Sequence, residues 1–270
     1  MGNYNETPTV IRFFPNLQRE GEHIVEFGEA TEERKKLYDE IFLQYFGPLS
    51  MAHPETSSQA ILLMGGPASG KSTIRKAIPD LQTFIVLDSD DVKEKLPEYH
   101  DLIEQGNTDA SAIVHEESSY ITRELRDYAV DNRYNILFDG VGSNIRSYSA
   151  LVKTLLEGGY RVRIIMVDAG LEIALMRSRM RKRRVPFSVL QYAYCCDRVR
   201  GNAKQLLMQY NVDGAVVNSY ARPAAIIWDR TSGIDTANDL EYAQLFWEGH
   251  CPDKFRVEIE EQTREMGAKT

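Results

Sequence analysis

Cysteine is scarce in this sequence: three occur among 270 residues, two adjacent at Cys195 and Cys196 and one at Cys251. Their number is odd, and they form neither a CxxC pair nor a Cys/His ligand spacing. This pattern argues against a disulfide scaffold and against a zinc site, and it favours reduced thiols in a reducing compartment.

Long apolar runs and an excess of positive charge are also missing. No stretch approaches the ~18 to 20 apolar residues of a membrane span, and residues 1–20 lack the basic start and apolar run of a secretory signal. We therefore expect a cytoplasmic protein with no membrane partner. The 32 Lys and Arg against 40 Asp and Glu give a net charge of −8, which argues against nucleic acid as a partner unless a local basic patch provides a site.

The apolar residues that are present follow an alternating pattern of strands and helices. A hydrophobic fraction of 43% is ordinary for a globular protein with a sizeable core. Helix patterns cover Thr31–Phe46 and Asp109–Asn132. Short apolar runs typical of parallel strands covered on both faces predict an α/β, doubly wound, mostly parallel sheet with helices on both faces. The expected strands are Ala60–Met64, Thr83–Leu87, Asn135–Phe138, Val162–Val167 and, more weakly, Ala215–Val217 and Ala224–Trp228.

The same pattern predicts three parts along the chain. Residues 1–57 form an N-terminal arm and a helix that packs on the core. Residues 58–230 form the core, with a lid near residues 171–186. Residues 231–270 form a C-terminal helix and a highly charged tail.

A glycine-rich segment carries the strongest chemical signal. Residues 65–72 read GGPASGKS, which fits the GxxxxGK[ST] pattern between an apolar run and a helix start. Such glycines let successive backbone N–H groups point at one phosphate beside a helix N-terminus. We therefore expect a P-loop NTPase-type fold in which Lys71 reaches the β- and γ-phosphates and Ser72 ligates Mg²⁺. The expected nucleotide-binding residues are Gly65, Gly66, Pro67, Ala68, Ser69, Gly70, Lys71, Ser72 and Thr73.

Two of the expected strands end in carboxylates. Asp139 closes one strand before Gly140, and the cluster Asp88–Asp91 closes another. An Asp at this position can simply cap a helix. Beside a phosphate loop, however, one carboxylate can serve the metal while another accepts the proton of an acceptor hydroxyl, which are the two roles that a kinase requires of acids.

Residues 177–184 read RSRMRKRR, six cations in eight residues of an otherwise acidic chain. Three interpretations compete. The segment can be a solvated basic helix face, a nucleic-acid or targeting patch without aromatic residues to stack on bases, or a lid whose arginines neutralise charge during phosphoryl transfer. We favour the lid, because Val185-Pro186 supplies a hinge or stop directly after it.

These motifs, together with the His115–Glu117 segment and in this order, resemble the zeta toxin family of P-loop kinases over roughly Ser58–Leu190. Members of that family use ATP or GTP with Mg²⁺. Characterised members phosphorylate a sugar hydroxyl of UDP-N-acetylglucosamine unless an antitoxin protein binds them. The resemblance therefore implies a phosphotransferase that acts on a small-molecule hydroxyl and has an antitoxin as a possible partner.

The resemblance also implies roles for individual residues. Asp90 matches the catalytic base, and Asp139 matches the acid that organises Mg²⁺. The remaining implied residues are Lys71 on the nucleotide, Arg181 and Arg183 as catalytic lid arginines, and Asp88, Glu116 and Glu117 with Asp139 as substrate-binding acids.

One departure from the family pattern bears on the acceptor. Val141 stands where the family commonly has Thr, so a hydroxyl is missing near the expected acceptor. Two alternatives stay open: a P-loop kinase for another acceptor, such as a nucleotide, an antibiotic or a polynucleotide 5′ end, and a nucleotide-dependent binding or switch protein. No NKxD-like guanine-reading element occurs, which argues against the switch.

Overall fold

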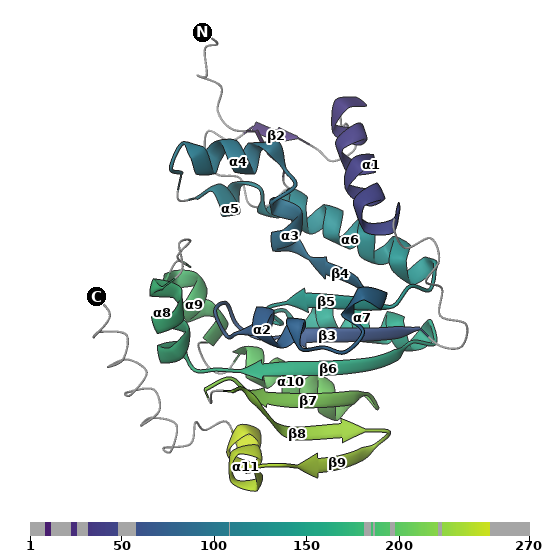
Figure 1. Cartoon of the computed structure of the whole chain (residues 1–270), viewed down its shortest axis with the longest axis vertical. Helices are drawn as coiled ribbons and strands as arrows, with labels where there is room; N and C mark the ends of the chain where they lie inside the picture. The colour runs from purple at the N-terminus through teal and green to yellow at the C-terminus, as the bar shows by residue number, and fades with distance from the viewer. Residues whose placement is uncertain are drawn as a thin grey trace. The chain divides into compact units, whose positions relative to one another are not determined.

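The computed structural model describes residues 9–11, 23–25, 32–47, 58–107, 109–180, 185, 187–194, 198–220 and 223–248 (Figure 1). The chain divides into two compact units. The first unit comprises residues 1–53 and 85–134, and the second comprises residues 54–84 and 135–270. No helix in the described ranges is both long and apolar enough to cross a membrane.

The second unit is built on a mixed sheet. Its strands are β3 (Gln59–Met64), β5 (Ile136–Gly140), β6 (Arg161–Asp168), β7 (Asp213–Asn218), β8 (Ala225–Thr231) and β9 (Ile234–Ala237), hydrogen-bonded in the order β5-β3-β6-β7-β8-β9. The pairs from β5 to β7 are parallel, whereas β8 and β9 are antiparallel to their neighbours. The first five of these strands overlap apolar runs found from the sequence, although β8 is antiparallel and not parallel as expected. The α/β fold class is confirmed.

Helices cover this sheet and supply its core. They are α2 (Lys71–Lys76), α7 (Ile145–Glu157), α8 (Leu171–Arg179), α9 (Phe187–Tyr194), α10 (Arg198–Gln209) and α11 (Leu240–Glu248), with a short 3-10 helix at Leu81–Thr83. Helices α7 and α10 pack against each other and on β6, and they lie behind the sheet in Figure 1. Every residue of β7 is buried, as are residues 60–64 of β3, so the core is centred on the middle strands.

The first unit is mainly helical. Its elements are β1 (Thr9–Ile11), β2 (His23–Val25), α1 (Glu32–Phe46), β4 (Ile85–Asp88), α3 (Ser89–Lys93), α4 (Pro97–Glu104), α5 (Ala110–Ile113) and α6 (His115–Asp131). Strands β1 and β2 form a separate parallel pair. The long helix expected over residues 109–132 is therefore present as two helices, α5 and α6, with Val114 between them.

Helix α1 packs on α6 through aromatic side chains. The ring centroids of Phe46 and Tyr128 are 4.6 Å apart, and those of Phe42 and Tyr128 are 5.8 Å apart. Aromatic contacts of this kind add to the stabilisation that burial of the rings provides. The N-terminal helix is therefore an integral part of the first unit.

Candidate functional site

The phosphate loop connects β3 to α2 by a tightly curled backbone. The Gly65 N–H donates to the carbonyl oxygen of Val141 at 3.3 Å, and the Ser69 N–H donates to the carbonyl oxygen of Gly66 at 3.1 Å. Gly70 has a φ of 105°, a backbone conformation that residues other than glycine rarely adopt. The local sequence therefore builds the strand, turn and helix start that a phosphate cradle requires.

The first two glycines of the loop lie against other parts of the unit. A Cβ on Gly65 would lie 2.9 Å from the carbonyl oxygen of Val167 and 2.7 Å from Ser69 Oγ. A Cβ on Gly66 would lie 2.3 Å from the ring of Tyr194, whose hydroxyl donates to the Pro67 carbonyl oxygen at 2.9 Å. Any side chain at either position would force these neighbours to move.

Two side chains of the loop fit a phosphate group. Lys71 Nζ donates to the carbonyl oxygen of Gly65 at 2.8 Å, so the ammonium group is folded over the loop. Ser69 is 1% exposed, and no described group hydrogen-bonds its Oγ. A buried hydroxyl without a partner is costly, and a phosphate oxygen would supply the acceptor that Ser69 Oγ lacks. The set of nucleotide-binding residues 65–73 stays a prediction.

Asp139 reaches the same end of the sheet as the loop. It pairs in register with Leu63 of β3, two residues before Gly65, and it is 9% exposed. Arg75 Nη1 lies 3.3 Å from Asp139 Oδ2. The carboxylate of Asp139 and the exposed hydroxyl of Ser72 are hard oxygen donors of the kind that Mg²⁺ prefers, although Arg75 shares the carboxylate.

No cluster of three or more His, Cys, Asp or Glu with metal-ligand geometry occurs within the described part of the chain. The metal-binding roles of Ser72 and Asp139 remain predictions.

Arg177 links the phosphate loop to the segment that follows β7 at the same end of the sheet, a contact that the sequence reasoning missed. Its Nη1 donates to the carbonyl oxygen of Ser69 at 2.7 Å and to Ser219 Oγ at 2.6 Å. Arg177 lies on α8 and Ser219 directly follows β7. The basic segment that begins at Arg177 was a signal for this residue, whereas nothing in the sequence marked Ser219.

The first unit carries the predicted catalytic base, Asp90. The backbone N–H of Asp90 donates to Asp88 Oδ1 at 2.9 Å, so Asp88 caps the short helix α3. Lys93 Nζ donates to Asp90 Oδ1 at 2.7 Å. Asp88 thus has a structural task beside its predicted role in substrate binding, and the role of Asp90 as a base is untested by these contacts.

Glu117, one of the predicted substrate-binding acids, is engaged by α1. It is 6% exposed, its Oε1 accepts a hydrogen bond from Arg34 Nε at 2.6 Å, and the Tyr38 hydroxyl donates to the same oxygen at 2.7 Å. Arg34 also donates to Glu98 at 2.6 Å. Burial and the neighbouring charge of Glu117 raise the pKa of Tyr38 well above its usual value. Glu116, the residue before Glu117, is partly exposed.

The predicted site residues are thus divided between the two units. The phosphate loop and Asp139 belong to the second unit, whereas Asp88, Asp90, Glu116 and Glu117 belong to the first. The predicted lid arginines Arg181 and Arg183 lie outside the described residues. That all of these residues act together stays a prediction.

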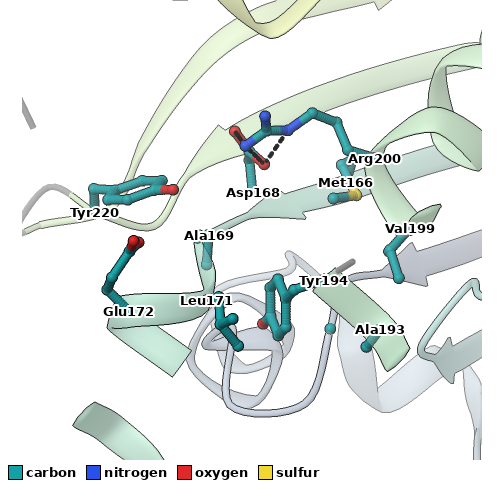
Figure 2. Close-up of a pocket in the computed structure, with 12 residues that line it drawn as sticks. Met166, Asp168, Ala169, Leu171, Glu172, Ala193, Tyr194, Val199, Arg200 and Tyr220 are labelled. Carbon is teal, nitrogen blue, oxygen red and sulfur yellow. Dashed lines mark hydrogen bonds and ion pairs between the residues drawn. The ribbon is translucent and has the colours of Figure 1, made fainter. Parts of the chain in front are cut away.

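A pocket of about 190 Å³ lies in the second unit next to the phosphate loop (Figure 2). It is formed where β6 ends and α8 begins, and its wall includes Gly66 and Tyr194. At its inner end Arg200 Nε donates to Asp168 Oδ1 at 3.0 Å, as the dashed line in Figure 2 shows. The sequence reasoning did not find this pocket, because its residues come from five separate segments.

Asp168 is a fully buried charge with several partners. It is 1% exposed, and its Oδ2 accepts a 2.6 Å hydrogen bond from the hydroxyl of Tyr242 on α11. Burial and the charge of Asp168 raise the pKa of Tyr242 far above its usual value. The network ties the C-terminal helix to the strand end beside the phosphate loop.

Comparisons with known proteins agree with this architecture. The model of the family described as Zeta toxin matches residues 49–226. A Toxin zeta of Streptococcus agalactiae is 30% identical over 88 residues, which cover 32% of this chain and 31% of that protein. The chain therefore spans about a third of the length of the curated relatives that it matches.

Two solved structures share the fold. A chain of the PezAT toxin-antitoxin system of Streptococcus pneumoniae superposes with a TM-score of 0.66 at 15% identity, covering 90% of this chain and 98% of that one. The AvrRxo1-ORF1:-ORF2 structure with ATP gives a TM-score of 0.66 at 18% identity, covering 81% of this chain and 74% of the other. At such low identities these matches show a common fold alone.

Proposed function

The chain belongs to the zeta toxin family, whose model matches well over half of its length, and we propose that it is an ATP-dependent kinase that phosphorylates a hydroxyl group of a small molecule. ATP is preferred to GTP in this proposal. The protein's best acceptor is UDP-N-acetylglucosamine, and its working compartment is the cytoplasm, where nucleotide sugars and ATP occur together.

The phosphate loop is the observation that carries the proposal. Its backbone curls between a buried strand and a helix start, Lys71 folds over it, and Ser69 Oγ lacks a hydrogen-bond partner within the described structure. These groups suit a chain of phosphates. The family membership and the match to a fold seen with ATP in AvrRxo1-ORF1:-ORF2 support the same ligand.

In the proposed reaction, an acceptor oxygen attacks the γ-phosphorus of ATP. A new oxygen–phosphorus bond forms, the bond from the γ-phosphorus to the β,γ-bridging oxygen breaks, and ADP leaves. Asp90 takes the proton of the attacking hydroxyl, and Lys71 holds the β- and γ-phosphates. Arg181 and Arg183 neutralise the charge that develops on the transferring group.

Ser72 and Asp139 would hold Mg²⁺, which supplies further neutralisation of phosphate charge when bound. Asp139 would have to loosen its contact with Arg75 to do so. Arg75 would therefore compete with Mg²⁺ for the carboxylate of Asp139.

The acceptor and the partner rest on family likeness. Glu116 and Glu117 are the acids proposed to bind the acceptor. Because the PezAT neighbour comes from a toxin-antitoxin system, we propose that an antitoxin protein also restrains this chain. A kinase that consumes a cell-wall precursor would require such control.

The test uses γ-labelled ATP, Mg²⁺ and a panel of acceptors: UDP-N-acetylglucosamine, UDP-glucose, a nucleoside, an aminoglycoside and a 5′-hydroxyl oligonucleotide. Transfer of label to UDP-N-acetylglucosamine above the other acceptors supports the whole proposal. Transfer to another acceptor retains the kinase and replaces the substrate. Label released only as inorganic phosphate would contradict the kinase proposal.

Asp90→Asn supplies the internal comparison. It should bind nucleotide as the wild type does and lose transfer by about 10²- to 10⁴-fold, the usual contribution of a general base. Asp101→Asn, on the exposed part of α4, is the matched control and should leave transfer unchanged. Wild-type turnover in Asp90→Asn would remove Asp90 from the mechanism.

A further inference from the structure

Lys93 is a buried cation placed beside the proposed base. Its Nζ donates to Asp90 Oδ1 at 2.7 Å and to Ser111 Oγ at 3.1 Å, and the residue is 5% exposed. The Asp90 side chain, by contrast, is 66% exposed. We propose that Lys93 is a positioning residue that fixes the carboxylate of Asp90 for proton transfer, an inference that rests on the proposed function.

The burial of Lys93 is expensive for the fold. An ammonium group removed from water loses its hydration, and an ion pair with a single, largely exposed carboxylate seldom repays that cost. Replacing a buried ion pair by apolar residues of similar volume is often neutral or stabilising. Because the Asp90 side chain is largely exposed, replacing Lys93 alone leaves no buried charge without a partner. The position of Lys93 is therefore better explained by its contact with the carboxylate of Asp90 than by a contribution to the stability of the fold.

The local structure explains why Asp90 needs to be held. It lies in the first turn of α3, a helix of only five residues, and its backbone N–H donates a hydrogen bond to Asp88 Oδ1. An exposed aspartate side chain samples several rotamers. Lys93, anchored from the other side by Ser111 of α5, restricts Asp90 Oδ1 to one of them.

Two elements thus cooperate in one contact. Helix α3 supplies both Asp90 and Lys93 at a spacing of three residues, where side chains share one face of the helix. Ser111 comes from α5 and fixes the far end of the lysine. A general base that is misplaced by about 1 Å can lose about 10²-fold in rate.

The test compares Lys93→Met with the wild type in the phosphoryl-transfer assay. We expect kcat to fall by about 10- to 100-fold, while the Kd for ATP stays as in the wild type. The temperature of unfolding should stay as in the wild type or rise. Ser111→Ala should give a smaller loss of kcat in the same direction. Lys95→Met is the matched control on the same segment, because Lys95 Nζ bonds Gln44 and not Asp90.

A double variant shows whether Lys93 acts through Asp90. In the Asp90→Asn background, whose residual transfer is measured with γ-labelled ATP, Lys93→Met should change the rate by less than about twofold. A full additional loss in that background would overturn the inference, because the two residues would then act independently. A Lys93→Met enzyme with wild-type kcat would also overturn the inference. So would a Lys93→Met enzyme whose loss of kcat is explained by unfolding of the protein.

The two proposals fail in different ways. A wild-type protein that transfers label to no acceptor contradicts both the proposed function and this inference. If the wild type is active and the Lys93→Met variant is equally active, only the positioning role is contradicted and the kinase proposal is retained.

Discussion

Arg177 Nη1 donates a 2.7 Å hydrogen bond to the carbonyl oxygen of Ser69, a residue 108 positions earlier in the chain. The same guanidinium bonds Ser219 after β7. A charged donor on a backbone carbonyl is among the stronger hydrogen bonds in proteins. The curl of the phosphate loop is therefore held by α8 and β7 as well as by its own glycines.

Arg177→Met should weaken ATP binding, because the loop loses its outside support. We expect the Kd for ATP, measured by titration calorimetry, to rise about tenfold, the equivalent of about 1.4 kcal/mol. Arg179→Met, two residues along the same helix at an exposed position, is the control for lost charge. Equal effects of the two substitutions would show that net charge matters and the contact with Ser69 does not.

The two leading glycines of the loop should respond differently to alanine. Gly66→Ala places a methyl group against the Tyr194 ring, and a side chain can move away. Gly65→Ala places it against the Val167 carbonyl oxygen, which belongs to a buried strand. We expect both variants to lose nucleotide affinity, and Tyr194→Ala to restore it in the Gly66→Ala background only.

Calorimetry on the two double variants measures this difference. Each is compared with Tyr194→Ala alone, which also removes the hydrogen bond to Pro67. Recovery of affinity in Gly65→Ala/Tyr194→Ala would refute the assignment of its clash to the β6 backbone.

Local signals explain what the sequence predicted. The apolar run before Gly65 and the glycine pattern itself lie within 13 residues, from Ala60 to Ser72, so the strand and the loop could be found without tertiary information. The antiparallel edge strand β9 was missed, because the residues of Ile234–Ala237 are mostly exposed and carry no apolar run.

Contacts between distant segments left no such signal. The Arg34–Glu117 pair spans 83 positions and the Arg200–Asp168 pair spans 32. Asp168 had no predicted role from the sequence, and Glu117 had only the substrate-binding role that the family resemblance implies. Because pairing of this kind depends on how helices pack, it becomes visible only in the folded chain.

Glu117→Gln tests the role of the contact between α1 and α6. The substitution removes the buried negative charge that accepts hydrogen bonds from Arg34 and Tyr38. We therefore expect it to lower the free energy of unfolding by about 2 kcal/mol. Urea denaturation measures this change. Glu116→Gln is the control in the same helical turn and should cost less than about 0.5 kcal/mol.

The same pair of variants separates bracing from acceptor binding. If Glu116 binds the acceptor, its variant raises the acceptor KM without destabilising the fold. If Glu117→Gln instead raises the acceptor KM and leaves stability unchanged, the bracing role of Glu117 is wrong.

Tyr242 should make stability fall at high pH. Burial and Asp168 raise its pKa in the folded protein, whereas in the unfolded chain it titrates near its usual value of 10.0. Above that value the folded state holds one proton more than the unfolded state, so the free energy of unfolding decreases as pH rises. Between pH 8 and pH 10.5 this residue alone should remove about 1 kcal/mol.

Tyr242→Phe isolates that contribution. The variant loses the hydrogen bond to Asp168 and should be less stable at pH 8 by about 1 to 2 kcal/mol, yet it should lose about 1 kcal/mol less than the wild type on going to pH 10.5. Urea unfolding at the two pH values measures both quantities. Tyr192→Phe, at a position that is 56% exposed, should retain the wild-type pH dependence. Identical losses in the wild type and Tyr242→Phe would mean that the Tyr242 hydroxyl titrates alike in the folded and unfolded chains, and that the bond to Asp168 does not hold its proton.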